Sequence, residues 1–462
     1  MLTPASWSDR LEILLAAVGG DGVRVERERL RHGVNAYVVS AFDRSALQFS
    51  LPVRIERDLS AFAAAPGGLD GVAAVAIEAV KAAAAAPSAD DLDPLAGRGT
   101  GFPGRYTASV EPYTLIASPS AIGGGLFRSG EENFADAGGF SLTLTGALPH
   151  APPGDTTAVR DQGDRLARLA GAVSGAVRRV PSRALARGWL SSLDQKGLRR
   201  SLANLGLVAF VGDGTRPARD YTRLRCHYRI AGPKEGRHVP FRCPVEFEPV
   251  EVELPASGET ATGLGIRSGE VFAIAGSNAE GKSTLLSAVL SGVDDHLPGD
   301  GRERVVTVRD PAFVEAGAHQ HHRADLSLFF ESLPPSLTGN PGAASGPGSG
   351  STSMADDIGR AIARGAPLLA FDEDRSAVNL LVPSCLTAPG VIPLSTLIAS
   401  GRERLGSTTV LFTAGALDLL TAEADRILVL EGFRAGAIAR AEFRHRLAAS
   451  LEPVLDRLKK GG

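Results

Sequence analysis

The chain has 462 residues, of which 44 % are hydrophobic and 22 % are charged, and its formal net charge is −3. This length predicts two or three domains with a sizeable buried core. The near-neutral charge excludes a polycation drawn as a whole to nucleic acid or anionic lipid, and no uncharged apolar run approaches the roughly 18 residues of a membrane helix. Three cysteines are too few for a disulfide framework, so we expect a cytoplasmic protein.

The first 240 residues predict an accessory domain of mixed α+β structure. Their predicted elements are, in chain order, short β-like runs within residues 1–60, an alanine-rich helix within 60–91, a Gly/Pro-rich connector over 94–106 and an alternating strand over 138–149. The run AAVAIEAVKAAAAA is typical of a helix because alanine has the highest helix propensity.

A basic and largely helical segment covers residues 160–229. It contains 15 Arg and Lys residues against 5 Asp residues, so its local charge is opposite in sign to that of the whole chain. One interpretation is contact with the phosphate backbone of a nucleic acid, RNA in particular. The other is a solvated helical face that pairs with the acidic remainder of the chain. Aromatic residues are few here, which gives base stacking little support, and the pattern leaves both interpretations open.

From residue 241 strands alternate with helices, which predicts an α/β domain built on a largely parallel sheet. We place this domain at 241–450 and a C-terminal tail at 451–462. Its predicted elements are strands at 245–254 and 271–275, helices at 281–291 and 354–364 that flank a Gly/Ser-rich loop at 337–353, and strands at 368–371, 408–412 and 426–430.

The strongest functional motif follows the strand at 271–275. It fits GxxxxGK[ST], the phosphate-binding loop or Walker A motif, and comprises Gly276, Ser277, Asn278, Ala279, Glu280, Gly281, Lys282, Ser283 and Thr284. Such a loop turns backbone N–H groups towards phosphates, and the helix after it directs its positive end at them. Lys282 would neutralise phosphate charge and Ser283 would bind Mg²⁺. The alternative is a plain Gly-rich turn.

A second motif ends the apolar strand at 368–371, where Asp372 and Glu373 follow. This pattern is typical of Walker B, in which Asp372 would hold Mg²⁺ and Glu373 would act as general base on the attacking water. Acidic residues often end strands, so the motif gains its meaning from its pairing with the phosphate-binding loop.

Together these motifs resemble the ABC-type ATPases. The loop GSNAEGKST is similar to their GPNGxGKST, and DEDRSAVN resembles their DEPTSALD, whose last four residues form the D-loop. This correspondence assigns Ser376 and Asn379 to the D-loop. The place of the ABC signature LSGGQ is taken by Ser349, Gly350, Ser351, Thr352 and Ser353. SGSTS in front of DEDxSAxN is closer still to the soluble "predicted ATPases of the ABC class", and the resemblance covers roughly residues 135–432.

The resemblance implies an ABC-type P-loop core, ATP and Mg²⁺ as ligands, and a homodimer that sandwiches two ATP molecules. The loop at 276–284 of one chain would face residues 349–353 of the other, and hydrolysis driven by Glu373 would release the dimer. The accessory domain would pass this cycle to an unknown protein partner. Three rival interpretations stay open. One is an RNA-binding ATPase acting through residues 160–229, and another is a P-loop kinase or phosphotransferase, which needs neither the SGSTS helix nor the SAVN run. The third is a nucleotide-gated switch with little turnover, which Ala414 favours.

The chain departs from the ABC pattern inside and beyond the phosphate-binding loop. Ala279 replaces the usual middle glycine, and Glu280 puts an acid in the loop, which we expect to face solvent. The position of the ABC switch histidine corresponds to Ala414, with no histidine nearby, which implies slow hydrolysis.

Two further ABC functions lack an obvious residue. Glu315 or Gln320 is the candidate for the Mg²⁺-sensing Q-loop, and Phe247 is the nearest candidate for stacking on adenine.

The run His319-Gln-His321-His322 is the one histidine cluster in the sequence. A metal site needs three or four ligands in suitable geometry, and the sequence shows no companion Cys/His set. We therefore expect a solvated or nucleotide-adjacent loop here rather than a metal site.

Overall fold

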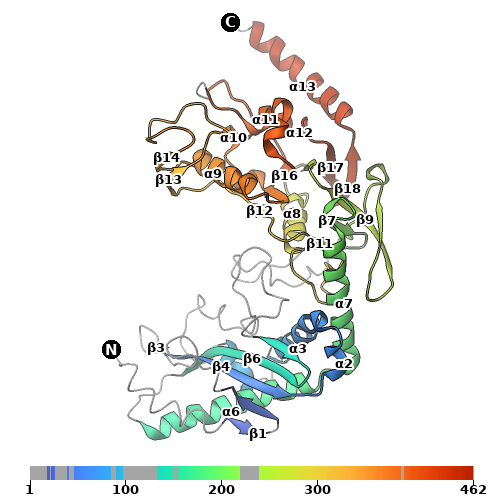
Figure 1. Ribbon diagram of the computed structural model, residues 1–462, viewed down its shortest axis with the longest axis vertical. Helices are drawn as coiled ribbons and strands as arrows, with labels where there is room; N and C mark the ends of the chain where they lie inside the picture. Colours follow the sequence, from blue (N-terminus) through green and yellow to red (C-terminus); the bar gives the residue numbers. More distant parts are fainter. Residues whose placement is uncertain are drawn as a thin grey trace.

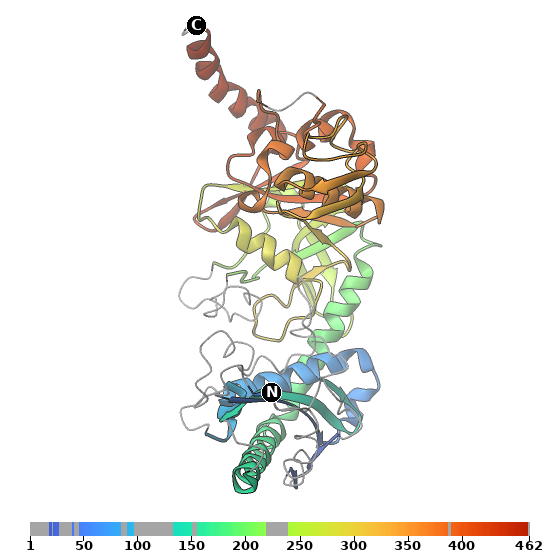
Figure 2. The same cartoon turned by 90° about the vertical axis from the view of Figure 1, so that its left-hand side faces the viewer.

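The computed structural model describes residues 18–20, 22–26, 39–40, 46–84, 90–96, 133–149, 155–218, 239–386 and 390–460. These residues form an elongated molecule, with an N-terminal unit at one end and the C-terminal helix at the other (Figures 1 and 2). Helix α7 (Ser182–Ser201) runs from the N-terminal unit towards the rest of the chain.

The N-terminal unit is built on a six-stranded antiparallel sheet of order β1-β2-β4-β6-β5, with β3 paired to β4. Its strands are β1 (Gly19–Gly20), β2 (Val23–Val25), β3 (Val39–Ser40), β4 (Ala46–Glu56), β5 (Phe134–Asp136) and β6 (Gly139–Pro149). Strands β4 and β6 pair along their whole length. Alternate residues of paired strands point to the same face, so Leu51, Val53 and Ile55 of β4 enter one buried core with Phe140 and Leu142 of β6.

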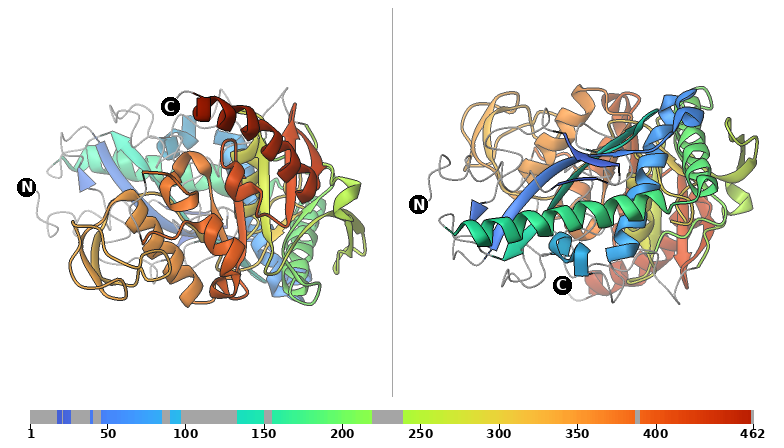
Figure 3. Two further views of the ribbon diagram at one scale, coloured as in Figure 1. Left: turned by 90° about the horizontal axis from the view of Figure 1, so that it is seen from above. Right: turned by 90° about the horizontal axis from the view of Figure 1, so that it is seen from below.

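Helices cover this sheet. They are α2 (Ser60–Ala63), η2 (Pro66–Gly68), α3 (Leu69–Ala84), η3 (Asp90–Leu92), α4 (Asp93–Ala96) and α6 (Thr156–Arg178). Helix α3 lies within the range predicted for the alanine-rich helix. Helix α6 begins where the Asp155 carboxylate accepts hydrogen bonds from the N–H groups of Thr157 and Ala158, and it runs along the sheet (Figure 3). Its apolar face, with Leu166, Leu169 and Val173, joins the same core.

The C-terminal part of the chain contains a second six-stranded sheet, of order β12-β15-β16-β10-β17-β18. Its strands are β10 (Val271–Gly276), β12 (Ala312–Phe313), β15 (Leu368–Phe371), β16 (Thr409–Ala414), β17 (Arg426–Glu431) and β18 (Arg434–Ile438). All neighbours pair in parallel except β17 and β18. This arrangement confirms the predicted α/β fold. The carboxyl ends of β10, β15 and β16 therefore meet at one edge of the sheet.

A four-stranded antiparallel sheet of order β11-β7-β9-β8 packs beside the parallel one. Its strands are β7 (Leu207–Gly212), β8 (Val250–Glu253), β9 (Thr260–Arg267) and β11 (Val305–Thr307). Strand β7 lies before residue 240, yet it pairs with both β9 and β11. The sheet thus crosses the domain boundary expected near that residue.

The remaining elements surround the parallel sheet. They are η6 (Val245–Phe247), α8 (Lys282–Ser291), the hairpin β13 (Gln320–Ala324) and β14 (Ala344–Pro347), α9 (Gly350–Ala363), η7 (Glu373–Arg375), α10 (Val378–Leu381), α11 (Leu394–Ser400), η8 (Arg402–Leu405), α12 (Asp418–Thr421) and α13 (Arg440–Lys460). Helix α13 has no buried residue, and it takes in most of the range expected as a tail. Within the described ranges, no helix has the length and apolar character needed to cross a membrane.

Candidate functional site

The phosphate-binding motif forms a tight loop between β10 and α8. Gly276 ends β10 with φ +145°, and a Cβ there would lie 2.5 Å from the carbonyl oxygen of Leu430. Gly281, with φ +95°, precedes the first residue of α8. Both conformations strongly favour glycine. The spacing of the two glycines therefore fixes where the strand stops and where the helix begins.

Lys282 folds back over this loop. Its Nζ donates hydrogen bonds to the carbonyl oxygens of Gly276 and Ser277, at 2.8 and 2.9 Å. Ser283 and Thr284 occupy the first turn of α8 and are half-buried. The cation thus sits at the helix N-terminus, where exposed N–H groups also attract anions.

The two unusual loop residues are accommodated in different ways. Ala279 adopts φ +65°, a left-handed conformation that costs a residue with a Cβ roughly 1–2 kcal/mol. Glu280 is only partly exposed to solvent, in contrast to the expectation from the sequence. It is half-buried, and its carboxylate accepts a hydrogen bond of 3.3 Å from the N–H of Phe433, in the turn between β17 and β18. The acid is thereby held by a neighbouring turn.

The Walker B carboxylates lie where β15 meets β16. Asp372 is buried, with 9 % exposure, and its Oδ1 accepts a 2.5 Å hydrogen bond from the hydroxyl of Thr413. The same hydroxyl accepts the N–H of Glu373 at 2.9 Å. The Glu373 carboxylate in turn accepts hydrogen bonds from the N–H groups of Gly415 and Ala416, the latter at 2.9 Å.

The two motifs converge at Gly415, just after β16. A Cβ placed on this glycine would lie 3.3 Å from Glu373 Oε2, 3.3 Å from Lys282 Nζ and 3.6 Å from Asn278 Oδ1. The end of β16 therefore brings the acid of one motif next to the cation of the other. Thr413 and Gly415 were not among the residues predicted from the sequence; the one available signal was their place just after the strand predicted at 408–412.

The candidate Q-loop residues separate in the structure. Val314 N donates to Ala370 O, and Ala316 N donates to Arg375 O, which places Glu315 alongside the end of β15. Its carboxylate forms an ion pair with Arg375. Gln320 lies elsewhere, at the start of β13 opposite Pro347. Of the two, Glu315 is the one beside the Walker B end of the sheet.

The SGSTS run starts helix α9. Ser349 is the N-cap, and its side chain and that of Thr352 form a reciprocal capping box. Thr352 and Ser353 are buried, whereas Ser349, Gly350 and Ser351 keep surface exposure. Burial therefore makes Thr352 and Ser353 inaccessible, and only the first three residues of the motif remain at the surface.

The signature and D-loop segments touch within one chain. The Ser351 hydroxyl donates a 3.0 Å hydrogen bond to Asn379 Oδ1 in α10. Ser376 lies in the sequence between the end of β15 and Asn379. Its hydroxyl donates to the carbonyl oxygen of Asp372 at 2.7 Å. The D-loop segment thus contacts both the end of the Walker B strand and the start of α9.

The prediction of Phe247 as the residue that stacks on adenine is wrong. It is buried, with 6 % exposure, and packs edge-on against Phe272 at 5.8 Å between ring centroids. Arg426 lies over both rings. The ring is part of the core between the two sheets and has no free face for a base. Ala414, the counterpart of the switch histidine, is also buried, with 5 % exposure.

The basic segment is only partly a free surface. Arg199 is buried in α7 and bonded to Asp295 Oδ1 at 3.0 Å and to the carbonyl oxygen of Gly292 at 2.9 Å. Arg178 donates to the carbonyl oxygen of Glu56. Other basic side chains of α6 and α7, such as Arg183 and Arg200, are exposed. The last part of the segment, residues 219–229, lies outside the described residues.

Comparison with known proteins bears on these motifs. The P-loop domain model of the ABC_ATPase family matches residues 181–453. An uncharacterized protein of Methanocaldococcus jannaschii is 39 % identical over 357 residues, which cover 77 % of each chain.

Among solved structures, cbiO1 of Clostridium perfringens, part of the ABC transporter complex cbiONQ, is 16 % identical with a TM-score of 0.30 over 55 % of this chain and 97 % of its own. An ATP-binding subunit of an ABC transporter is 15 % identical with a TM-score of 0.30 over 52 % and 93 %. The family model spans more than half of the chain, and the archaeal relative extends across most of it. The chain belongs to the ABC_ATPase family of P-loop proteins.

Proposed function

We propose that this chain binds ATP with Mg²⁺ and hydrolyses it slowly, as a homodimer that forms around the nucleotide. The observation that carries the proposal is the convergence at Gly415, which places Glu373 Oε2 and Lys282 Nζ around one small gap at the end of β16. A general base and a phosphate-binding cation held this close suit attack of water on a terminal phosphate.

The residues present fit both ligands. The backbone of loop 276–281 and Lys282 would bind the phosphates, at the start of a helix of 10 residues. The Ser283 hydroxyl and the Asp372 carboxylate supply the oxygen ligands that Mg²⁺ prefers, and Glu315 is a further oxygen donor beside the same strand end. When bound, Mg²⁺ would neutralise charge on the phosphates.

Glu373 is the residue we assign to general-base catalysis. Backbone N–H groups of Gly415 and Ala416 orient its carboxylate. These two residues directly follow Ala414, which corresponds to the histidine of ABC-type ATPases. Alanine at position 414 can neither donate nor accept a proton. We therefore propose that turnover is slow and that the ATP-bound state is long-lived.

The dimer is supported by the accessible start of α9. Ser349, Gly350 and Ser351 stay exposed or half-buried, and the N-terminus of this 14-residue helix favours negative charge. We propose that these residues contact the γ-phosphate bound by the second copy, with Asn379 beside them. The N-terminal unit would then transmit closure of the dimer to an unidentified partner.

The substitution Glu373→Gln tests this mechanism. It keeps the shape of the side chain and removes its basicity, so ATP binding persists while hydrolysis falls by a factor of roughly 10² or more. We expect light scattering after size exclusion to show a dimer with ATP and Mg²⁺ and a monomer without them. Glu403→Gln is the matched control, because Glu403 is exposed in η8, before the amino end of β16.

Two outcomes would contradict the proposal. A Glu373→Gln chain that binds ATP but stays monomeric excludes the sandwich and favours a P-loop kinase or phosphotransferase. A chain that dimerises only when RNA is added, with affinity that falls steeply with salt, favours an RNA-dependent ATPase acting through the exposed basic residues of α6 and α7.

A further inference from the structure

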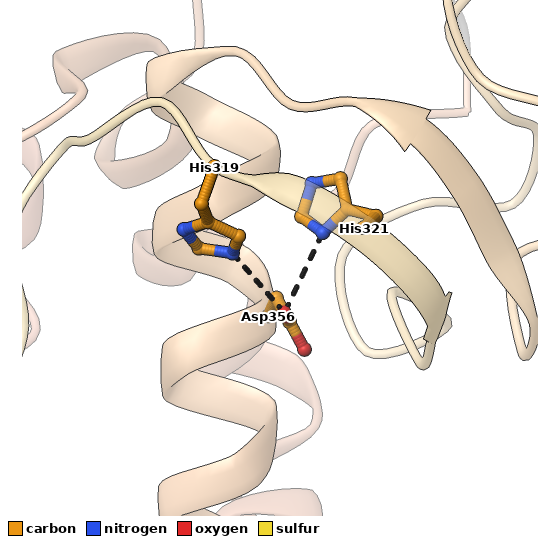
Figure 4. A group of neighbouring side chains, drawn as sticks. All are labelled: His319, His321 and Asp356. Carbon is orange, nitrogen blue, oxygen red and sulfur yellow. Dashed lines mark hydrogen bonds and ion pairs between the residues drawn. The ribbon is translucent and has the colours of Figure 1, made fainter.

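We propose that His319, His321 and Asp356 bind a divalent transition-metal ion such as Zn²⁺ beneath the start of helix α9. His319 and His321 belong to the histidine run, whose metal-binding interpretation lacked a third ligand. The fold provides that ligand from α9, 37 residues beyond His319 in the sequence. Figure 4 shows both imidazoles directed at the Asp356 carboxylate.

The spacing of the donor atoms suits a metal ion. His319 Nε2 and His321 Nδ1 lie 3.3 and 3.5 Å from Asp356 Oδ2, and one ligand atom from each residue lies within 4.8 Å of the others. Ligands at about 2.1 Å from a tetrahedral Zn²⁺ stand about 3.4 Å apart. Two imidazoles and one carboxylate form a known donor set for Zn²⁺ and other divalent transition metals.

Strand geometry selects two histidines of the run and excludes the third. Successive side chains of a strand point to opposite faces, so His321 is buried, with 1 % exposure, while its neighbour His322 is exposed. His319 lies just before β13, on the side of His321, and its side chain is 36 % exposed. The site therefore has two buried ligands and one at the surface, which leaves a route for the ion to enter.

The hydrogen bonds around Thr352 are compatible with a metal-binding tautomer of His321. The Thr352 hydroxyl lies 3.2 Å from the Ser349 carbonyl oxygen, takes the Ser349 N–H at 2.8 Å and lies 3.2 Å from His321 Nε2. When the hydroxyl gives its one proton to the carbonyl, Nε2 is the donor in the contact with Thr352, and Nδ1 keeps its lone pair for an ion.

The other ring nitrogen of His321, Nδ1, is buried beside the carboxylate. Among the described residues it has no hydrogen-bond partner, and it lies 3.5 Å from Asp356 Oδ2. A metal ion between the two would take the Nδ1 lone pair and the carboxylate as ligands. Nε2 would then carry the proton and donate it to Thr352, the outer hydrogen bond that commonly orients a histidine ligand.

The ion would join β13 to the helix that presents SGSTS. Asp356 is six residues, or about 1.7 turns, from the start of α9, and Thr352 is shared between the capping box and His321. Arg360 also contacts Asp356 Oδ2, at 3.2 Å, but its side chain is 64 % exposed and lies closer to Asp357, at 2.6 Å. Metal binding would thus fix the position of the accessible signature residues.

The test uses the full chain, purified without a polyhistidine tag and treated with a chelator. Titration with Co²⁺, followed by its visible d–d absorption and then by displacement with Zn²⁺, should show one equivalent of bound ion. His319→Ala and Asp356→Asn should each weaken binding at least tenfold. His322→Ala is the matched control and should bind like the wild type. Zn²⁺ should also raise the unfolding temperature of the wild type and of His322→Ala only.

Three results would overturn the proposal. The first is the absence of a stoichiometric ion. The second is equal affinity in the wild type and the His319→Ala and Asp356→Asn variants, which means an adventitious ion only. The third is an equal loss in His322→Ala, which places the ion on the exposed histidines. Because none of these readouts involves ATP, failure here is separate from failure of the ATPase proposal.

Discussion

At the scale of single residues, Thr413 organises the acidic end of β15. Its hydroxyl donates to Asp372 and accepts the N–H of Glu373, so one side chain sets the orientation of two carboxylates with different assigned roles. Asp372 is left with further lone pairs for a cation, and Glu373 is turned towards Gly415. Thr413, a short polar residue at the end of the neighbouring strand, thereby holds the two carboxylates in different orientations.

Gly415→Ala is expected to lower ATP hydrolysis with little effect on stability. The new methyl group would lie 3.3 Å from both Glu373 Oε2 and Lys282 Nζ, closer than most real contacts, so one of these side chains must move. Misplacement of a catalytic group by a fraction of an ångström to one ångström costs roughly tenfold to a hundredfold in rate. Steady-state phosphate release measures this. Gly171→Ala, with no atom of the described residues within 4 Å of the added carbon, should hydrolyse ATP at the wild-type rate.

Residue types explain which parts of the site could be predicted from the sequence. Gly276, Gly281 and Lys282 stand in a local pattern, because the backbone of the loop demands those types at that spacing. The prediction that Phe247 stacks on adenine was wrong, because nearness to the loop in sequence does not tell whether the core buries the ring. Thr413 and Asp356 act through contacts across 41 and 37 residues, and no local pattern encodes such pairs.

At the scale of elements, an ion pair holds the amino ends of the parallel strands. Asp425, just before β17, accepts the N–H of Val271 at 2.8 Å and the guanidinium of Arg402 at 2.9 Å. Arg402 also donates to the carbonyl oxygen of Gly269. One carboxylate thus connects β10, β17 and η8 at the end of the sheet away from the phosphate-binding loop.

This ion pair predicts an acid-sensitive part of the stability. Burial alone would raise the pKa of Asp425, but the hydrogen bonds from Arg402 and Val271 and the charge of Arg402 outweigh it and hold the pKa below its usual value of 3.8. The stabilisation is therefore present above about pH 4 and is lost as the pH falls through the lowered pKa.

Asp425→Asn should accordingly lower the free energy of unfolding by about 1 kcal/mol at pH 7, a value that allows for the partial solvent exposure of the ion pair. Below pH 4 this loss should become progressively smaller. Urea unfolding at several pH values measures the difference. Asp374→Asn, at an exposed position, should follow the wild-type pH profile. An Asp425→Asn penalty that is equal at pH 7 and pH 3 would contradict this interpretation.

At the scale of the whole molecule, α7 joins two units whose boundary was predicted near residue 240. In the first half of α7, Trp189 Nε1 donates to the carbonyl oxygen of Phe62 at 2.9 Å. In its second half, Lys196 pairs with Asp70 of the N-terminal unit, while Arg199 is bound to Asp295 and Gln195 to His296. Strand pairing of β7 across that boundary could not be foreseen, because its partners lie at least 50 residues later in the chain.

Arg199→Ala is expected to destabilise the protein by about 3–5 kcal/mol, because it leaves Asp295 buried with part of its counter-charge removed. Arg199→Lys keeps the charge but not the paired guanidinium hydrogen bonds, so its loss should be intermediate. Thermal or urea unfolding of the two variants measures both. Arg200→Ala is the matched control: the neighbouring side chain is exposed, and its removal should change stability by less than about 0.5 kcal/mol.

The attachment of α7 to both units along one stretch of helix has a mechanical consequence. Ten residues separate Trp189 from Arg199, about 15 Å of helix, and Lys196 between them pairs with Asp70 of one unit and Asp295 of the other. A rigid rod of that length, turned by about 10° at one end, carries its other end through about 3 Å. The helix would act as a stiff lever arm, so that a small rotation of the nucleotide-binding sheet becomes a displacement of a few ångströms at the N-terminal sheet.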